Sequence, residues 1–376
     1  MHTLKGELPD LFQFTNGKRV GSADDWLRRR DELRELILDI EYGHLPPRPT
    51  LVRGDLLHEH SMQTAGQPDA NHVQYRISIE GGERPFWFIL DLLIPQVEGA
   101  PSAGAKLPVV VNGDGCWKYL TEEIVGEVLR RGYILATFNR TEIAPDDYQH
   151  PERSAALYQV YPDGDFGALA AWAWGYHRVV DFLVTQDCVD ASRIAVVGHS
   201  RGGKTVLLAG ATDERIALTA PNDSGSGGAG CFRWQGEGCE KLDDGLRVFP
   251  YWYSPRLSEF IDREQDLPFD QHSLKALVAP RALLSTEALG DLWANPSGTY
   301  QTYLAAREAY RFLGSEERIG IWYREGGHDH GIADWKAFLD FADLQFRGIA
   351  PDSRFDVNPF PDMPSAFSWS APTAAG

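Results

Sequence analysis

The sequence predicts an α/β protein with a mainly parallel central sheet and helices on both faces. Short apolar runs alternate with helical patterns from residue 107 to residue 348, an order typical of a parallel sheet covered on both sides. Several of these runs lead directly into polar or Gly-rich loops. With 376 residues the chain can bury a large core, and we expect one domain over residues 1–376.

The first hundred residues are expected to decorate this sheet. Residues 24–46 carry apolar side chains at helical spacing, and Gly43 and Pro46 end that pattern, so we predict an amphipathic helix. Residues 72–80 alternate between apolar and polar, and residues 86–95 are almost continuously apolar. These two segments predict a hairpin pair of strands.

The remaining elements follow in chain order. Strands are expected within residues 107–115, 193–200, 216–228, 280–291 and 319–331. A helix followed by a strand is expected in residues 122–146, a long helix in 167–186, and further helices after residue 200 and in 333–348. The tail, residues 350–376, is rich in Pro, Ser and Ala and should lie over the surface or be mobile.

Charge and composition bear on partners and compartment. The net charge of −18 argues against nucleic acid and anionic membranes as partners. We find no apolar run approaching the ~20 residues of a membrane span. The start shows no signal-peptide pattern, which predicts a cytoplasmic protein if the chain is complete as given, and a secreted or periplasmic one if a signal was removed. Nothing in the sequence specifies an oligomeric state.

The four cysteines are Cys116, Cys188, Cys231 and Cys239. Their spacing matches no zinc motif, and we expect neither a metal nor a cofactor in the reaction. Cys231 and Cys239 could pair in an exported protein, and free thiols are the alternative.

A Gly-x-Ser-x-Gly sequence marks the candidate nucleophile. Gly198, Ser200 and Gly202 stand where an apolar strand pattern meets a helical one, which is the context of a nucleophile elbow. Such a turn exposes the Ser200 hydroxyl and places helix N-terminal N–H groups near a developing oxyanion. The alternative is an ordinary serine at a helix N-terminus.

An acid and a base should follow the serine in the chain. His328 and His330 both lie in the loop after the last predicted strand, and the two glycines before His328 favour that residue. The acid has two candidates, each after a predicted strand: Asp223 and Asp291. Either carboxylate could hold the imidazole and stabilise its protonated form.

Two cations accompany the serine. Lys204 lies one helical turn after Ser200 and should share its face of the helix. Arg201 supplies a backbone N–H to the oxyanion, and its guanidinium could reach the same oxygen. The Gly-rich loop of residues 112–119 could supply a second oxyanion donor or form the pocket rim.

Several motifs together resemble the glucuronoyl esterases, carbohydrate esterase family fifteen. These motifs are GHSRGGK, NDSGSGGAGCFR, LPFDQHSLKALVAPRALL and DLWANPSG, and the resemblance covers roughly residues 107–341. It implies an α/β-hydrolase fold, no metal, and cleavage of esters between glucuronic acid on xylan and lignin alcohols.

The resemblance also implies roles for individual residues. Ser200 would be the nucleophile, Arg201 the oxyanion helper and Lys204 a ligand of sugar hydroxyls. The acid would be Asp223, where fungal members have Glu, or Asp291, the position used by some bacterial members. Substrate-binding tryptophans would be Trp293 and Trp252, the latter beside the family's pocket segment.

Two departures from the fungal pattern concern the catalytic loops. The fungal cysteine before the serine is His199 here, and its partner cysteine is Gly331, so no disulfide is expected between the nucleophile and base loops. The fungal alignment favours His330 as the base, whereas bacterial members favour His328.

The expected function is therefore a serine esterase acting through an acyl-enzyme on a 4-O-methyl-glucuronoyl ester of a plant cell-wall saccharide. Its partner would be a small-molecule or oligosaccharide ester substrate. One alternative keeps the same triad in an acetyl-xylan esterase, another carbohydrate esterase or an acyltransferase. Another is a non-catalytic saccharide-binding protein on a hydrolase scaffold.

Overall fold

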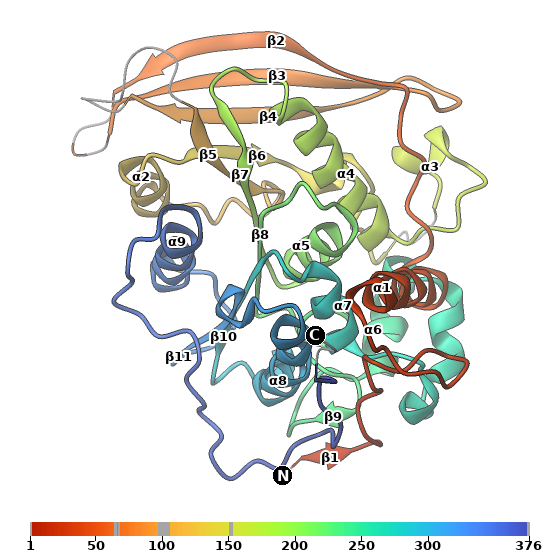
Figure 1. Cartoon of the computed structure of the whole chain (residues 1–376). Helices are drawn as coiled ribbons and strands as arrows, with labels where there is room; N and C mark the ends of the chain where they lie inside the picture. The colour runs from red at the N-terminus through yellow and green to blue at the C-terminus, as the bar shows by residue number, and fades with distance from the viewer. Residues whose placement is uncertain (1, 64–65, 67, 97–105, 150–152, 374–376) are drawn as a thin grey trace.

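A twisted nine-stranded sheet runs through the whole protein (Figure 1). The structure is a computed structural model, and it describes residues 2–63, 66, 68–96, 106–149 and 153–373. The strand order is β11-β10-β8-β7-β5-β6-β4-β3-β2. A separate two-stranded sheet joins β1 near the N-terminus to β9.

The sheet combines a parallel part with an antiparallel part. Pairs from β6 through β5, β7, β8 and β10 to β11 are parallel, whereas β6, β4, β3 and β2 pair antiparallel. The strands are β1 Thr3–Leu4, β2 Leu51–Met62, β3 Ala70–Glu80, β4 Phe86–Pro95, β5 Leu107–Asn112, β6 Ile134–Phe138, β7 Val189–His199, β8 Leu218–Asn222, β9 Trp234–Gln235, β10 Ala282–Ala288 and β11 Ile319–Arg324.

Helices cover both faces of the parallel part. The α-helices are α1 Ala23–Ile37, α2 Glu122–Arg130, α3 Leu157–Val160, α4 Ala168–Leu183, α5 Arg201–Thr212, α6 Leu242–Val248, α7 Gln271–Val278, α8 Pro296–Phe312 and α9 Ile332–Arg347. Short 3₁₀ segments lie at Arg140–Glu142, Pro250–Trp252, Pro255–Phe260, Glu264–Asp266, Leu292–Ala294 and Glu316–Arg318, and a π-helical turn at Leu38–Tyr42 extends α1.

Two apolar cores hold these layers together. Helices α2 and α9 pack on one face of the sheet, where Val110, Val197 and Leu284 meet Val128 and Phe338. The larger core on the other face contains α4, α5, α7 and α8, and α1 packs outside α7 (Figure 1). A parallel sheet with both faces buried confirms the α/β class, because its strands are apolar on both sides.

Two long elements were not expected from the sequence. Strand β2 forms the outer edge of the sheet, and most of its side chains are exposed, so it lacks an apolar face. Helix α8 begins at Pro296, whose missing N–H suits the first turn of a helix. The expected hairpin is present as β3 and β4, in register from Ala70 opposite Pro95 to Ile79 opposite Phe86.

The described part of the tail lies against the N-terminal segment and α8. The Trp369 indole donates to the backbone oxygen of Leu8 at 2.7 Å, and the Ala366 N–H donates to Gln301 Oε1 at 2.9 Å. The expected surface location is therefore present. The single-domain organisation stays a prediction.

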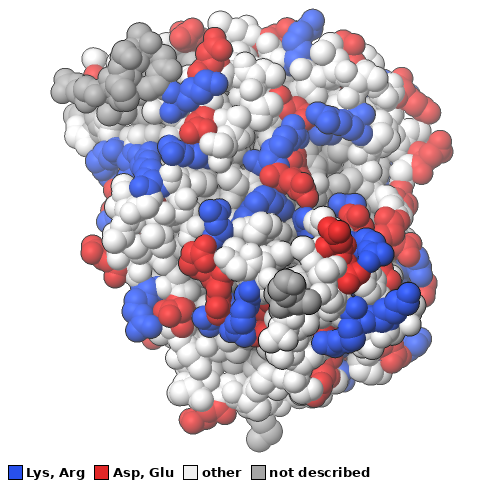
Figure 2. All heavy atoms as spheres, viewed as in Figure 1, with Lys and Arg blue, Asp and Glu red and all other residues white. Residues whose placement is uncertain are grey.

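The surface carries charges of both signs (Figure 2), and the cysteines are unpaired. On the face drawn in Figure 2, basic side chains lie interspersed with acidic ones. None of the described helices is both long and apolar enough to cross a membrane. The four cysteines are free thiols, so Cys231 and Cys239 are not paired in the structure.

Close packing between the serine helix and the sheet gives a stability prediction. A Cβ added at Gly210 in α5 would overlap the buried Thr219 side chain on β8. Gly210→Ala should therefore lower the free energy of unfolding in urea by about 1–3 kcal/mol, despite the better helix propensity of Ala. At Gly21 the nearest atom to an added Cβ is Asp25 Oδ2 at 3.7 Å. Gly21→Ala is the control, and an equal loss there would contradict the packing argument.

Candidate active site

Ser200 lies in a strained turn between β7 and α5. Its backbone has φ 55° and ψ −121°, a region that non-glycine residues adopt rarely. Glycine is required at its neighbours, because a Cβ on Gly198 would overlap the Gly202 carbonyl and one on Gly202 would overlap the Asp114 carboxylate. The Ser200 N–H donates to the Asn222 carbonyl at 2.9 Å, which ties the turn to the end of β8.

The serine opens into a cavity of about 310 Å³ that both rival histidines also line. Its walls include Trp117, Tyr119, His199, Ser200, Arg201, His328, Asp329 and His330. The loop after β5 therefore forms one side of the pocket, as expected for residues 112–119.

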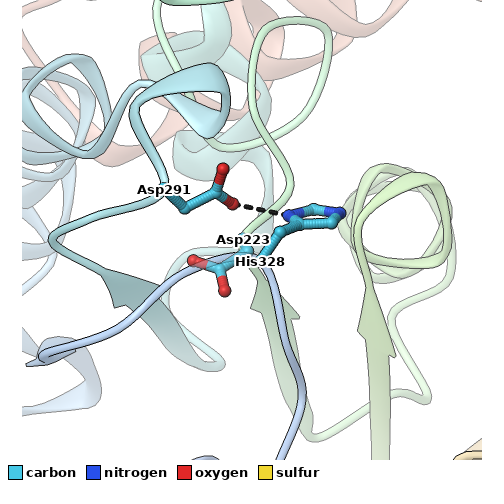
Figure 3. A group of neighbouring side chains, drawn as sticks. All are labelled: Asp223, Asp291 and His328. Carbon is cyan, nitrogen blue, oxygen red and sulfur yellow. Dashed lines mark hydrogen bonds and ion pairs between the residues drawn. The ribbon is translucent and has the colours of Figure 1, made fainter.

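His328 is paired with Asp291. The imidazole Nδ1 lies 2.5 Å from Asp291 Oδ2, and Figure 3 shows the carboxylate directed at the ring from the loop after β10. Asp291 is buried, whereas His328 keeps 43% of its side chain exposed. The hydrogen bond to Asp291 raises the pKa of His328 against the opposing effect of burial. Because Nδ1 of His328 is hydrogen-bonded to Asp291, Nε2 is the ring nitrogen that can accept a proton from a nucleophile.

Asp223 lies beside this pair but makes different contacts. Its Oδ1 accepts the Ala288 N–H at 2.7 Å, and its Oδ2 lies 3.3 Å from the Arg324 guanidinium. Burial raises its pKa to about 7, and the negative charge of Asp291 adds to that shift. Of the two candidate acids, Asp291 is thus the one hydrogen-bonded to an imidazole.

His330 packs as a buried aromatic residue. Only 3% of it is exposed, and its ring stacks on Trp335 at 5.3 Å and lies 5.2 Å from the Tyr119 ring. Among the described residues its Nδ1 has no hydrogen-bond partner. Burial lowers its pKa well below the ordinary histidine value. In the described part of the chain, neither Asp223 nor Asp291 forms a hydrogen bond with His330, whereas Asp291 forms one with His328.

His199 fills the space between the two loops. Its Nδ1 lies 2.6 Å from Asn222 Oδ1, and its ring centroid is 4.4 Å from that of His328. Burial lowers the pKa of His199 to about 4, so the ring is neutral near pH 7. A neutral ring here packs against His328 without repelling its protonated form.

Arg201 is held at the pocket by a carboxylate and three aromatic rings. Its guanidinium donates to Asp146 Oδ2 at 3.1 Å, and its central carbon lies 4.7 Å from the Trp252 ring, 4.8 Å from Phe249 and 5.7 Å from Trp117. The side chain is nevertheless 26% exposed. A cation fixed in this way at the serine can stabilise developing negative charge without reorganising.

Asp146 organises this corner of the pocket, although the sequence analysis did not single it out. Its Oδ2 also accepts from Arg140 at 3.3 Å, and its Oδ1 accepts from the Tyr251 hydroxyl at 2.8 Å and the Trp252 indole at 3.2 Å. The residue follows β6, beyond a short 3₁₀ turn. Its place after a parallel strand was the available signal, because such loops gather at one edge of the sheet.

The two predicted substrate tryptophans have different surroundings. Trp252 is only 2% exposed, and its ring stacks on Phe249 at 3.9 Å beneath Arg201, so it supports the cation rather than offering a face to a sugar. Trp293 is 51% exposed. Its carbonyl accepts the Glu240 N–H at 2.9 Å.

Lys204 is buried and already engaged. Its ammonium donates to Glu240 Oε2 at 2.9 Å and to the Ser226 carbonyl. Two of its three donors are thus used within the protein, and one remains for a ligand. Glu240 was missed by the sequence analysis, and its contact with the Trp293 carbonyl links the lysine to the exposed tryptophan.

The acid–base cluster has the spacing of a possible metal site. Ligand atoms of Asp223, Asp291 and His328 all lie within 4.8 Å of one another. However, Asp291 is bonded to His328, and Asp223 to Arg324 and the Ala288 N–H. Both carboxylates are thus already engaged by other groups, one of them a cation, and this fits an acid–base site better than a divalent-ion site.

The sequence of this chain is similar to those of known esterases. The fungal glucuronyl esterase family matches residues 88–314, more than half of the chain. A carbohydrate esterase from an unidentified prokaryote is 31% identical, covering 92% of this chain and 91% of its own. A 4-O-methyl-glucuronoyl methylesterase of Podospora anserina is 32% identical over 87% of this chain, which spans 64% of that relative's length.

The structure of this chain is similar to solved structures of esterases from the same family. A family 15 glucuronoyl esterase from Caldicellulosiruptor kristjansonii has a TM-score of 0.83 at 30% identity, covering 98% of each chain. A promiscuous family 15 esterase from a marine bacterial metagenome has a TM-score of 0.77 at 29% identity, covering 92% of this chain and 98% of its own. With the expected α/β-hydrolase fold confirmed and relatives of this identity matching nearly its whole length, the chain belongs to the glucuronoyl esterase family, carbohydrate esterase family 15.

Proposed function

We propose that this protein is a serine carboxylic-ester hydrolase that cleaves 4-O-methyl-glucuronoyl esters of plant cell-wall saccharides. The observation that carries the proposal is the shared cavity of Ser200, Arg201 and His328, with Asp291 bonded to the imidazole. The names of its relatives, which include 4-O-methyl-glucuronoyl methylesterases, support the substrate class.

The hydrolysis would proceed in two halves. Ser200 Oγ attacks the ester carbonyl carbon while His328 Nε2 takes the hydroxyl proton, and the carbonyl electron pair moves to oxygen. When the tetrahedral intermediate collapses, the bond to the leaving alkoxide breaks and the imidazolium returns the proton to it as an alcohol. Water then attacks the acyl-enzyme with His328 again as base, which releases the uronic acid and restores Ser200.

Asp291 and Arg201 would stabilise the charges that this sequence creates. Asp291 accepts the Nδ1–H of His328, holds the required tautomer and stabilises the imidazolium. Arg201 and the N–H groups at the start of α5 face the oxyanion. Asp223, whose pKa is raised to about 7, would add negative charge behind the pair where it is ionised, without touching the imidazole.

Substrate selection would depend on Lys204 and Trp293, two residues that are not among those lining the cavity of Ser200. The free donor of Lys204 suits a sugar hydroxyl, and the exposed ring of Trp293 suits the apolar face of a pyranose. Trp252 would act indirectly, by holding Arg201. The cytoplasmic or exported location stays a prediction.

The substrate assignment is tested by comparing a uronic-acid ester with an acetyl ester of a saccharide. Purified protein should hydrolyse benzyl glucuronate, whereas an acetylated xylo-oligosaccharide should react at least tenfold more slowly in kcat/KM. Ser200→Ala should abolish both activities, because no other nucleophile replaces the hydroxyl. Hydrolysis of the acetyl ester alone would contradict the uronic-ester proposal but keep the esterase, and full activity in Ser200→Ala would overturn both.

The choice of acid is tested by two matched substitutions. Asp291→Asn should lower the pH-independent kcat about 10³- to 10⁴-fold, because the imidazole loses its orienting acceptor. His328 must be neutral to act as base, so kcat/KM falls as pH drops through its pKa. Asp291 raises that pKa, and the acid limb of Asp291→Asn should therefore move to lower pH.

Asp223→Asn is the matched control for that experiment. It removes no hydrogen bond to His328, and because the pKa of Asp223 is raised to about 7 it removes little charge on the acid limb. Its kcat should therefore stay within about tenfold of the wild type, and its acid limb should shift less, in the same direction. A larger loss in Asp223→Asn than in Asp291→Asn would assign the acid role to Asp223.

Asp146 is predicted to act as a positioning residue through Arg201. Asp146→Asn should lower kcat about 10- to 100-fold with a smaller change in KM, since an oxyanion contact is made only in the transition state. The control is Tyr251→Phe, which removes the hydrogen bond from the Tyr251 hydroxyl to Asp146 but keeps the Asp146–Arg201 pair. The decisive measurement is the double variant with Arg201→Ala: the two losses should not add. Additive losses, or a fall in thermal stability alone, would show a purely structural role.

A further inference from the structure

Three histidines lie together on the antiparallel side of the sheet, outside the active site. His58 and His60 are two residues apart on β2 and so share a face, and His60 pairs directly with His72 of β3. The ring centroids of His58 and His60 are 4.7 Å apart, those of His60 and His72 are 5.1 Å apart, and those of His58 and His72 are 6.3 Å apart. Strand register alone thus gathers three imidazoles at one point. We call these residues the β2–β3 histidine cluster.

A carboxylate supports this cluster from the next strand. Asp91 of β4 lies opposite Gln74 of β3, and its Oδ1 is 2.7 Å from His72 Nε2 and accepts from Gln74 Nε2 at 3.0 Å. A hydrogen bond from one imidazole nitrogen to a carboxylate leaves the other nitrogen available and fixes the ring orientation. This is the usual support of a metal-bound histidine. In His72 that arrangement leaves Nδ1 for an ion.

The spacing of the rings matches a tetrahedral ion. With Zn–N bonds of about 2.0–2.1 Å and tetrahedral angles, the centroids of two bound imidazoles lie about 5.2 Å apart. The three observed separations of 4.7, 5.1 and 6.3 Å bracket that value. The ring nitrogens themselves do not converge in this structure, because among the described residues only Asp223, Asp291 and His328 bring three ligand atoms within 4.8 Å of one another. His58 and His60 are exposed, so binding would require rotation about their side-chain bonds to turn their nitrogens to a common point.

We propose that the β2–β3 histidine cluster binds one divalent transition-metal ion such as Zn²⁺. His58, His60 and His72 would be the protein ligands, water would complete the coordination, and Asp91 would hold His72. Three imidazoles favour Zn²⁺, Ni²⁺ or Cu²⁺ over Mg²⁺ or Ca²⁺, which prefer oxygen ligands.

The bound ion would join the outer strand of the sheet to its neighbour. Strand β2 ends the sheet order, and among the described strands it pairs only with β3 (Figure 1). Helix α4 also contacts it. A metal held by both strands binds the folded sheet and not the separated strands, so it would stabilise the fold in proportion to its concentration. The cavity of Ser200 is lined from the loops after β5, β7 and β11, away from β2 and β3, so the ion would not take part in ester hydrolysis.

The test is Zn²⁺ binding by calorimetry on protein first stripped with EDTA. Wild type should bind Zn²⁺ at this site, and its melting temperature should rise with Zn²⁺ concentration. His60→Gln and His72→Gln should each weaken the binding at least about 100-fold and remove the shift, since each deletes a ligand. Asp91→Asn keeps all three ligands and should weaken it about 10- to 100-fold.

Two control variants make the outcome decisive. His44 is a surface histidine elsewhere, paired with Asp165 and Glu35, and His44→Gln should bind Zn²⁺ as the wild type does. Zn²⁺ could instead bind to Asp223, Asp291 and His328 in the active site, and Asp291→Asn tests that location because it removes one of those three groups. Loss of Zn²⁺ binding in Asp291→Asn but not in His60→Gln, or equal losses in His60→Gln and His44→Gln, would overturn the proposal. Circular dichroism of each variant excludes unfolding as the cause.

Discussion

The strained backbone at Ser200 is the constraint on which the active site depends. An L-residue at φ 55° and ψ −121° costs free energy on the order of 1–3 kcal/mol, and the surrounding structure must impose it. Here β7 delivers the chain at the carboxyl edge of the sheet, α5 leaves at once, and Gly198 and Gly202 allow the backbones to touch. The same turn sets the positions of Arg201 and Lys204, so cation placement follows from the nucleophile's geometry.

The charges around this turn are arranged in separate pairs. Asp291 meets His328, Asp146 meets Arg201 and Arg140, and Glu240 meets Lys204. Each buried or half-buried cation is thus matched to a carboxylate. Pairing of this kind keeps side chains charged and oriented in a region where desolvation would otherwise be costly. These three carboxylates therefore have a local use at the site, separate from any effect of net charge.

Aromatic packing replaces a covalent tie between the catalytic loops. The resemblance to fungal members placed a cysteine pair where this chain has His199 and Gly331. In the structure the His199 ring lies 4.4 Å from His328 and 5.6 Å from His330, and His330 stacks on Trp335. Neutral imidazoles can fill that space because burial lowers their pKa values. The nucleophile and base loops are therefore joined by packing, and the hydrogen bond from His199 to Asn222 ties the nucleophile loop to the end of β8.

The sequence by itself determined the fold class, the serine turn and the family, because apolar periodicity, glycine spacing and short motifs are local properties of the chain. It missed β2, which has no apolar face, and Asp146 and Glu240, which lie in loops without a motif. Only the tertiary structure decided that Asp291 rather than Asp223 meets His328, that Trp252 lies beneath Arg201, and that His58, His60 and His72 gather on one face. Those outcomes depend on where side chains from separate strands point, and strand order and register set those directions.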